Sequence, residues 1–264
     1  GIALQSVNTY TFRTPDYQIS AAQDYNPGYW GAQTLMWQAT LDGDAVVVTS
    51  LPTTVELGGD SVEVAGEWVG SWHPRATVYR NAAVIQYRAD SIPDLLAGFF
   101  KPKNSHAFFR RAAFAETREI GNWVMGRLGN GYIALYSKAP THWSTENEYE
   151  LATDVQDNTW LVQLGSTSEF GSFDDFADAV SASAVQFDEE GRVEWDSPSV
   201  GIVTVGWTGP FMVEGREVDL GPYKRFENSS ADVDFGSRVT RIRSGDRTLE
   251  LDFANGTRKV VKHQ

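Results

Sequence analysis

The sequence predicts an all-β protein built as a large antiparallel β-sandwich, with one short helix near 172–183. Short segments rich in β-branched and aromatic residues recur at spacings of roughly ten residues, separated by Gly, Asn, Asp and Pro. This spacing indicates roughly fifteen or more strands, against a single convincing helical pattern. Because a parallel sheet needs a crossover helix after most strands, we expect stacked antiparallel sheets.

The strands can be followed in order along the chain. Before the centre they are expected at 7–13, 17–23, 34–41, 45–50, 76–79 and 82–88. Asp42-Gly43 predicts a tight hairpin, and 52–72 is interpreted as a peripheral strand or a long loop. Further strands are expected at 148–153, 159–165, 185–187, 193–195, 201–207, 211–213, 218–220, 223–227, 233–235, 238–243, 247–253 and 257–262.

The clearest hairpin lies at the centre, where a two-residue Asn130-Gly131 turn would pair Leu128 with Ile133 and Gly126 with Leu135. That apolar set would face the core. The opposite face would carry an aromatic and basic set that either binds a sugar ring or packs under a neighbouring segment. Its members are Trp123, Met125, Arg127, Tyr132, Ala134 and Tyr136.

The helix is predicted to begin at Ser172, because Asp175 follows three residues later in a capping-box spacing. Phe173, Phe176 and Val180 then repeat at helical spacing and would form one buried face. The whole chain, 1–264, is interpreted as one large sandwich domain. A smaller terminal sheet at 199–264, after a break near 189–198, is the alternative.

The composition excludes several classes of function. A formal charge of −13 opposes binding to a phosphate backbone, so no nucleic-acid partner is expected. The absence of cysteine excludes disulfides, thiolate metal sites and a cysteine nucleophile. No apolar run approaches the roughly 18 residues that span a bilayer, so no membrane partner is expected. Nucleotide and dinucleotide motifs are absent, and no cofactor is expected.

Five of the 22 basic residues lie between Lys101 and Arg118, and His106 lies among them. The other three basic residues are Lys103, Arg110 and Arg111. Such a group in an acidic protein either neutralises an anionic ligand or pairs with surface carboxylates. These two interpretations stay open at this point.

The remaining histidines and acids offer weaker candidates. His73 and His142 each adjoin a tryptophan, and no His-x-His spacing occurs, so no zinc site is expected. Asp232 and Asp234 are either calcium ligands or exposed strand-end acids. Asn255-Gly-Thr matches a glycosylation site, but a hairpin turn explains it better.

Four segments carry a resemblance to a known family. They are Tyr17-Gln-Ile-Ser-Ala-Ala-Gln-Asp-Tyr, Gln33-Thr-Leu-Met-Trp-Gln-Ala-Thr-Leu, His106-Ala-Phe-Phe-Arg-Arg-Ala-Ala-Phe and Trp123-Val-Met-Gly-Arg-Leu-Gly-Asn-Gly-Tyr-Ile-Ala-Leu-Tyr-Ser. In pattern they resemble the C-terminal β-supersandwich portion of heparinase II/III-like polysaccharide lyases and their uncharacterised bacterial relatives. The resemblance implies β-elimination at a uronic acid, with an acid, a base and a cation that neutralises the carboxylate.

Carried onto this chain, the resemblance implies a catalytic set of His106, Tyr132 and Arg110. His106 would be a base or a substrate contact, Arg110 or Arg111 would neutralise the carboxylate, and Tyr132 or Tyr136 would donate a proton. Substrate contacts are expected at Arg111, Arg127, Tyr136, Trp30, Trp72 and His73. The His-x-His strand that binds metal in several such lyases is absent here.

The resemblance also implies partners and a setting. An acidic polysaccharide or oligosaccharide would be the ligand, and an N-terminal helical toroid domain of the same protein would complete the active site. The chain would then be a fragment of a longer, secreted enzyme, extracellular or periplasmic. The alternative is a non-catalytic carbohydrate-binding or structural sandwich, in which Trp30, Trp37, Trp72 and Trp143 stack on sugars or support the fold.

Overall fold

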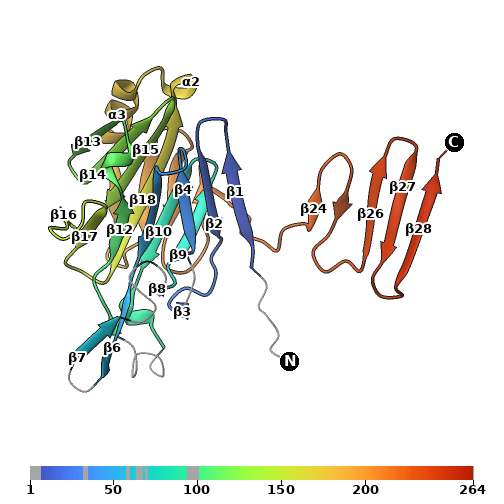
Figure 1. Ribbon diagram of the computed structural model, residues 1–264, viewed down its shortest axis with the longest axis horizontal. Helices are drawn as coiled ribbons and strands as arrows, with labels where there is room; N and C mark the ends of the chain where they lie inside the picture. The colour runs from blue at the N-terminus through green and yellow to red at the C-terminus, as the bar shows by residue number, and fades with distance from the viewer. Residues whose placement is uncertain are drawn as a thin grey trace. The chain divides into compact units, whose positions relative to one another are not determined.

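The computed structural model describes residues 7–31, 35–57, 60–63, 68, 71–93 and 101–263 (Figure 1). The chain divides into two units, Gly1–Asp219 and Leu220–Gln264, which we call the large unit and the small unit. The described residues are mostly strands in antiparallel sheets, which confirms the predicted all-β sandwich class. No helix among them is long and apolar enough to cross a bilayer.

Two antiparallel sheets of the large unit face each other. In spatial order the seven-stranded sheet contains β1 (Thr9–Arg13), β2 (Gln18–Ala22), β4 (Trp37–Thr40), β5 (Val46–Ser50), β12 (His106–Phe109), β17 (Glu150–Thr153) and β16 (Thr141–Trp143). The six-stranded sheet contains β13 (Glu116–Ile120), β14 (Trp123–Leu128), β15 (Gly131–Ser137), β18 (Asn158–Ser166), β10 (Ala82–Tyr87) and β9 (Arg75–Tyr79).

The main core lies between these two sheets and follows from period-two alternation along the strands. Val47 and Phe109 enter it from the seven-stranded sheet, and Ile85, Ile133 and Trp160 enter it from the six-stranded sheet. All five side chains are completely buried. Burial of each such side chain stabilises the fold by about 1.5–3 kcal/mol relative to leaving it exposed.

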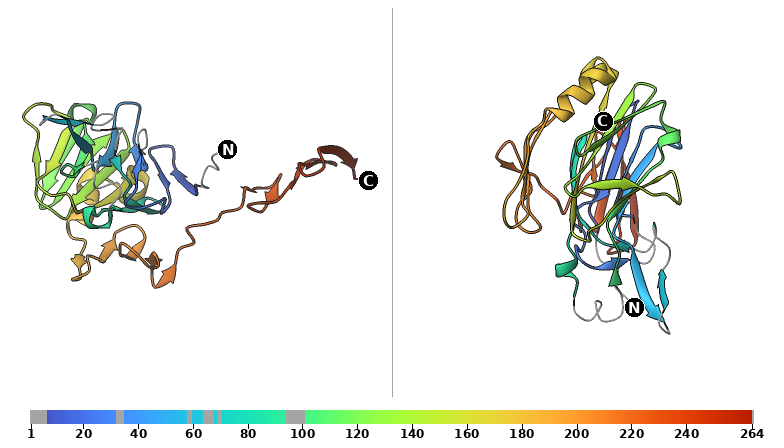
Figure 2. Two further views of the ribbon diagram at one scale, coloured as in Figure 1. Left: turned by 90° about the horizontal axis from the view of Figure 1, so that it is seen from below. Right: turned by 90° about the vertical axis from the view of Figure 1, so that its left-hand side faces the viewer.

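A third layer covers the other face of the six-stranded sheet, as Figure 2 shows in its right-hand view. It consists of the helices α2 (Thr167–Phe170) and α3 (Phe173–Ser181) and a five-stranded sheet of β19 (Val185–Phe187), β20 (Val193–Ser197), β21 (Gly201–Val205), β22 (Met212–Val213) and β23 (Arg216–Glu217). Trp195 of this sheet packs on Trp123 with ring centroids 6.1 Å apart. The buried Arg75 donates hydrogen bonds of 2.6 Å to the carbonyls of Gly206 and Gly209.

Helix α3 forms where the sequence predicted it. The Ser172 hydroxyl accepts a hydrogen bond from the Asp175 amide at 3.1 Å, which is the expected N-cap. Phe173, Phe176 and Val180 form the buried face. The short helix α2 immediately before it was not predicted.

Smaller elements lie around the sandwich. They are the pair β3 (Trp30–Gly31) and β8 (Ser71–Trp72), the three-stranded sheet of β11 (Lys101–Pro102), β6 (Thr53–Leu57) and β7 (Asp60–Glu63), and the 3-10 turns η1 (Ala89–Ser91) and η2 (Arg111–Ala113). The segment 52–72 therefore contains peripheral strands. Its residues 58, 59, 64–67, 69 and 70 lie outside the described part of the chain.

The small unit consists of the hairpin β24 (Phe226–Glu227) and β25 (Asp232–Val233) and a sheet of β26 (Val239–Ser244), β27 (Arg247–Asp252) and β28 (Thr257–Lys262). The unit boundary falls after Asp219, later than the predicted start of a terminal sheet at 199. Residues 201–217 instead supply β21, β22 and β23 of the third layer.

The central hairpin has a register two residues away from the predicted one. Leu128 pairs with Gly131 and Gly126 pairs with Ile133, so that Gly129 and Asn130 make the turn. Gly129 has a φ of +58°, which suits glycine at this turn. Because the shift is an even number of residues, each side chain still points to the predicted face.

The fold predicts that replacing Gly131 with alanine destabilises the protein. A Cβ there would collide with the carbonyl oxygen of Asp16, a backbone atom that cannot easily move. Gly131→Ala is expected to lower the free energy of unfolding by about 1–3 kcal/mol, measured by urea denaturation. Gly43→Ala is the matched control, because a Cβ at Gly43 meets nothing within 4 Å. Equal effects of the two variants would contradict the prediction.

Candidate functional site

The candidate site lies on the outer face of the seven-stranded sheet, where strand β12 presents His106. Alternation along β12 sends Ala107 and Phe109 into the core, and His106 and Phe108 therefore point to the opposite face. His106 is 3% exposed. A nearly buried imidazole needs hydrogen-bonding partners, and the neighbouring strand supplies one.

That partner is Glu150 of β17, whose Oε1 lies 2.7 Å from Nδ1 of His106. Asn147 donates a second hydrogen bond to Oε2 of Glu150 at 3.1 Å. The hydrogen bond with His106 is the main cause that lowers the pKa of Glu150 to about 2, against the opposing effect of burial. Glu150 is therefore a carboxylate at every physiological pH.

An aromatic cluster surrounds this pair. Trp68 lies flat on the His106 ring, with centroids 3.9 Å apart and planes 4° from parallel. Phe108 meets the same indole edge-on at 5.5 Å and packs on Tyr149 at 5.2 Å. Trp68, Phe108 and Tyr149 are each partly exposed. We call Trp68, His106, Phe108 and Tyr149 the Trp68 cluster.

A hollow of about 310 Å³ adjoins His106 on the same face. Seven of its nine lining residues are of polar or charged type; the nine are Pro52, Lys103, Asn104, His106, His142, Glu150, Ala152, Thr153 and Asp154. We call it the His106 hollow. It brings together cationic or titratable donors and two carboxylates, a combination that can hydrogen-bond a hydroxylated or carboxylated ligand.

Sequence reasoning gave no role to His142, yet this residue lines the hollow. His142 and His106 both pair with Ala152, from the two sides of β17, which places their Cα atoms about 10 Å apart. The Nδ1 atom of His142 lies 4.0 Å from Oδ1 of Asp154. No local spacing could reveal this proximity, because it depends on the strand order β12-β17-β16.

The basic segment of the sequence is not one cluster in the structure. Lys103 lines the His106 hollow, whereas Arg110 is exposed just after the end of β12, four residues beyond His106 and about 13 Å from it. The Arg111 guanidinium lies 4.3 Å from the Trp143 ring. Arg118 forms ion pairs with Glu116 and Asp174, as expected if the basic residues pair with surface carboxylates. Lys101 belongs to β11, paired with β6.

Tyr132, expected as a proton donor, lies on a different face of the protein. It points from β15 away from the main core, beneath helix α3, and is 2% exposed. Its hydroxyl is hydrogen-bonded to Thr167 Oγ1 at 2.7 Å. The six-stranded sheet and the main core separate it from His106, so the predicted catalytic set of His106, Tyr132 and Arg110 does not assemble in this structure.

The other residues on that face of β14 and β15 have packing roles. Tyr136 meets Trp123 at a centroid distance of 5.1 Å, and burial raises the pKa of its phenol. Nε of Arg127 pairs with Glu116 Oε2 at 3.4 Å. Of the two readings of this face, the structure favours packing under a neighbouring segment over sugar binding.

The remaining predicted contacts lie near β3 and β8. Trp30 and Trp72 are register partners in this short ladder, and Trp72 is fully buried. His73 is buried beside Tyr25, with ring centroids 5.7 Å apart, and burial lowers its pKa. Trp37 is a core residue whose indole N–H donates to Thr49 Oγ1 at 2.8 Å. These side chains support the fold.

Metal-ligating side chains do not gather in the described part of the chain: no group of three or more His, Asp or Glu residues there could hold an ion. Asp232 lies 2.8 Å from Nζ of Lys224, an ion pair rather than a calcium ligand set.

The buried pair predicts a specific pH dependence of stability. The folded pKa of Glu150, about 2, lies below its ordinary value of 4.5. The stabilisation that the ionised Glu150 contributes is therefore complete above about pH 4.5 and is lost as the pH falls towards 2. Glu150→Gln is expected to lower the free energy of unfolding by about 1–2 kcal/mol near neutral pH. The expected loss is no larger because solvent partly screens the Glu150 carboxylate.

Urea denaturation at a series of pH values checks this expectation. The difference between wild type and Glu150→Gln should shrink steadily through the acid range. Glu148→Gln provides the control, because Glu148 is exposed two residues away and should show almost no difference at any pH. A Glu150→Gln effect that is the same in acid and at neutral pH would show that the charge of Glu150 does not stabilise the fold.

Comparison with known proteins found no matching family model, no matching curated protein and no matching solved structure. The candidate site is therefore argued from its own geometry, and the resemblance to heparinase II/III-like lyases stays a prediction.

Proposed function

We propose that the large unit binds a glycan on the outer face of its seven-stranded sheet, in the His106 hollow beside the Trp68 cluster. The observation that carries this proposal is the combination of partly exposed aromatic rings with a polar hollow on one sheet face. Ligand sites pair apolar and aromatic walls with a few placed polar groups that fix orientation.

The two parts of the site suit the two parts of a sugar. The C–H face of a pyranose ring packs against aromatic side chains, and Tyr and Trp offer an apolar ring with a polar edge. Sugar hydroxyls need both donors and acceptors. In the hollow Lys103 and Asn104 can donate, and the carboxylates of Glu150 and Asp154 can accept.

The hollow contains a cation that can receive the carboxylate of an acidic sugar. The large unit as a whole is strongly acidic and repels anions, so an acidic glycan needs a local cation. Lys103 provides one, and the exposed imidazole of His142 adds a further hydrogen-bonding group. The Glu150 carboxylate is hydrogen-bonded to His106 and Asn147, so it repels a bound anion less than a carboxylate without such partners would.

A second candidate function is β-elimination at the same hollow, and the His106–Glu150 pair is the observation that favours it. A carboxylate that fixes one ring nitrogen of a histidine is a common arrangement in acid–base sites. Tyr149, a member of the Trp68 cluster, would then be the phenol of the site in place of the distant Tyr132. The N-terminal helical domain expected from the resemblance would complete this site.

The binding proposal predicts that Lys103→Ala weakens affinity for uronic-acid oligosaccharides by about tenfold, the loss of one charge-assisted hydrogen bond. Calorimetric or fluorescence titration of the full chain measures this, with neutral oligosaccharides of equal length for comparison. Affinity for the uronic acids should fall with salt, because a lysine–carboxylate contact is screened. Affinity for neutral sugars should change little.

Lys138→Ala is the matched control, because Lys138 lies outside the hollow, against the ring of Phe187. Trp68→Ala should weaken binding of charged and neutral sugars alike. The proposal fails if no sugar of the panel binds, or if Lys138→Ala has the same effect as Lys103→Ala. Ultraviolet absorbance of the same mixtures tests elimination: growth of an unsaturated product that stops in His106→Ala would support the second candidate over simple binding.

A further inference from the structure

The small unit has almost no core of its own. Among its described residues Val233, at 4% exposure, is the one buried apolar side chain. Its exposed large apolar side chains are Phe226, Phe235, Ile242, Phe253 and Val260. Units of this size bury too little surface to be stable without additional support, so an uncovered apolar surface here calls for a partner.

The register of the three-stranded sheet collects apolar residues on one face. Ile242, Leu249 and Val260 are directly opposite one another across the three strands, and Leu251 lies on the same face one step along β27. We call these four residues the apolar face. Val260 is 55% exposed. The reverse face carries Arg241, Glu250 and Lys259 in one row, with Arg241 and Glu250 paired at 2.6 Å.

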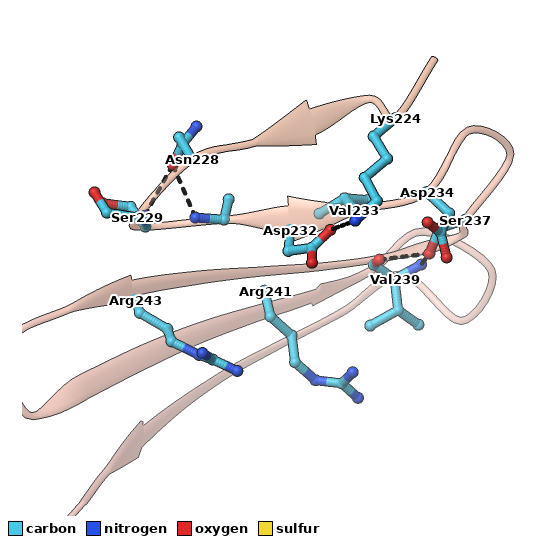
Figure 3. A pocket seen from close by; sticks show the side chains of 12 residues that line it. Lys224, Asn228, Ser229, Asp232, Val233, Asp234, Ser237, Val239, Arg241 and Arg243 are labelled. Atoms are coloured by element: carbon cyan, nitrogen blue, oxygen red, sulfur yellow. Dashed lines mark hydrogen bonds and ion pairs between the residues drawn. The ribbon is translucent and has the colours of Figure 1, made fainter. Parts of the chain in front are cut away.

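Several polar groups around the β24–β25 hairpin have partners within the small unit. A hollow of about 450 Å³ lies between the β24–β25 hairpin and β26. Figure 3 shows its lining, in which Lys224 pairs with Asp232 and Oδ1 of Asn228 accepts hydrogen bonds from two backbone N–H groups. These contacts organise the hairpin and leave no strong preference for a ligand. The unmet requirement of the unit is a cover for its apolar face.

The apolar face has a basic rim and belongs to a basic unit. Arg247, Arg258 and Lys262 lie on the same face, and Asp246 partly offsets two of them at 3.9 and 3.6 Å. Nine of the 22 Lys and Arg residues and six of the 35 acids fall within 220–264, which gives formal charges of +3 there and −16 in 1–219. The basic rim therefore favours an acidic partner surface.

Two simpler ways to cover the sheet are disfavoured by charge. Pairing of two β28 edges would bring Arg258, Lys259 and Lys262 of each copy together, and such cations protect edge strands from pairing. Stacking two apolar faces around a two-fold axis would likewise oppose basic rims. A contact between unlike surfaces avoids both repulsions.

We propose that the apolar face and its basic rim dock onto the acidic surface of a second copy of this chain. The chain carries a net charge of −13, so each copy offers such a surface. Because the two contacting surfaces differ, the association is heterologous and adds copies in rings or open chains rather than stopping at a two-fold dimer. Both apolar burial and charge attraction contribute to this contact.

Sedimentation velocity of the full chain over a wide concentration range, at low and high salt, tests the proposal. Wild type should associate beyond a dimer at low salt, and high salt should weaken the association. The double variant Arg258→Glu/Lys262→Glu should raise the apparent Kd at least about tenfold. Val260→Ser should weaken association to a similar degree, because it removes exposed apolar area at the centre of the face.

Lys259→Glu is the matched control for charge, because it lies on the same strand and points to the reverse face. Val261→Ser is the corresponding control for apolar area. Neither should change the association, and circular dichroism checks that all variants keep their strands. A chain that stays monomeric at every concentration overturns the proposal. Association that is insensitive to salt, or that the controls weaken equally, also overturns it.

Discussion

The architecture of the large unit depends on the complete burial of one strand, β18. All nine of its residues are buried, although it lies in an antiparallel sheet, a type that often leaves one face in water. Trp160, Val162 and Leu164 point into the main core. Leu161 and Gln163 point the other way and need a cover, which the helices and the five-stranded sheet provide.

Gln163 shows how that cover is held in place. An amide in the middle of a buried sheet face costs about 1–3 kcal/mol unless its polar atoms find partners. The Ser197 hydroxyl donates to its Oε1 at 2.7 Å, and its Nε2 donates to Ser199 Oγ at 3.0 Å. Ser197 is the last residue of β20 and Ser199 lies in the turn after it, so these hydrogen bonds hold the third layer in place and also satisfy the polar atoms of Gln163.

The third layer also explains where a binding site can lie. It occupies the face of the six-stranded sheet that holds Tyr132 and Tyr136, which removes the phenol of Tyr132 from contact with a ligand and leaves Tyr136 only partly exposed. His106, Phe108 and Glu150 point from the outer face of the seven-stranded sheet, next to a hollow. The third layer thus covers the outer face of the six-stranded sheet (Figure 2), and the proposed site lies on the outer face of the seven-stranded sheet.

The fold was predictable from local features, and the site was predictable only in part. The spacing of the turns predicted the all-β class, and the Ser172 cap predicted helix α3. The alternation of side chains along each strand predicted the two faces of the central hairpin. The predicted hairpin register was wrong, because the turn lies at Gly129 and Asn130 and Gly131 already belongs to β15, where the Asp16 carbonyl approaches it. His106 was identified as a candidate, whereas its partner Glu150 required knowledge of the strand order.

Residues that are close in the sequence are not always close in space, and the basic segment and the histidines His106 and His142 both show this. The run from Lys101 to Arg118 is divided by strand β12, which carries its members to different ends and different neighbours. His142 is isolated in the sequence, yet it shares a cross-strand row with His106. A ligand in the hollow would therefore meet Lys103 and two imidazoles held opposite Glu150 and Asp154. Selectivity for an acidic sugar would come from the placement of these few groups, because the net charge of the chain acts against it.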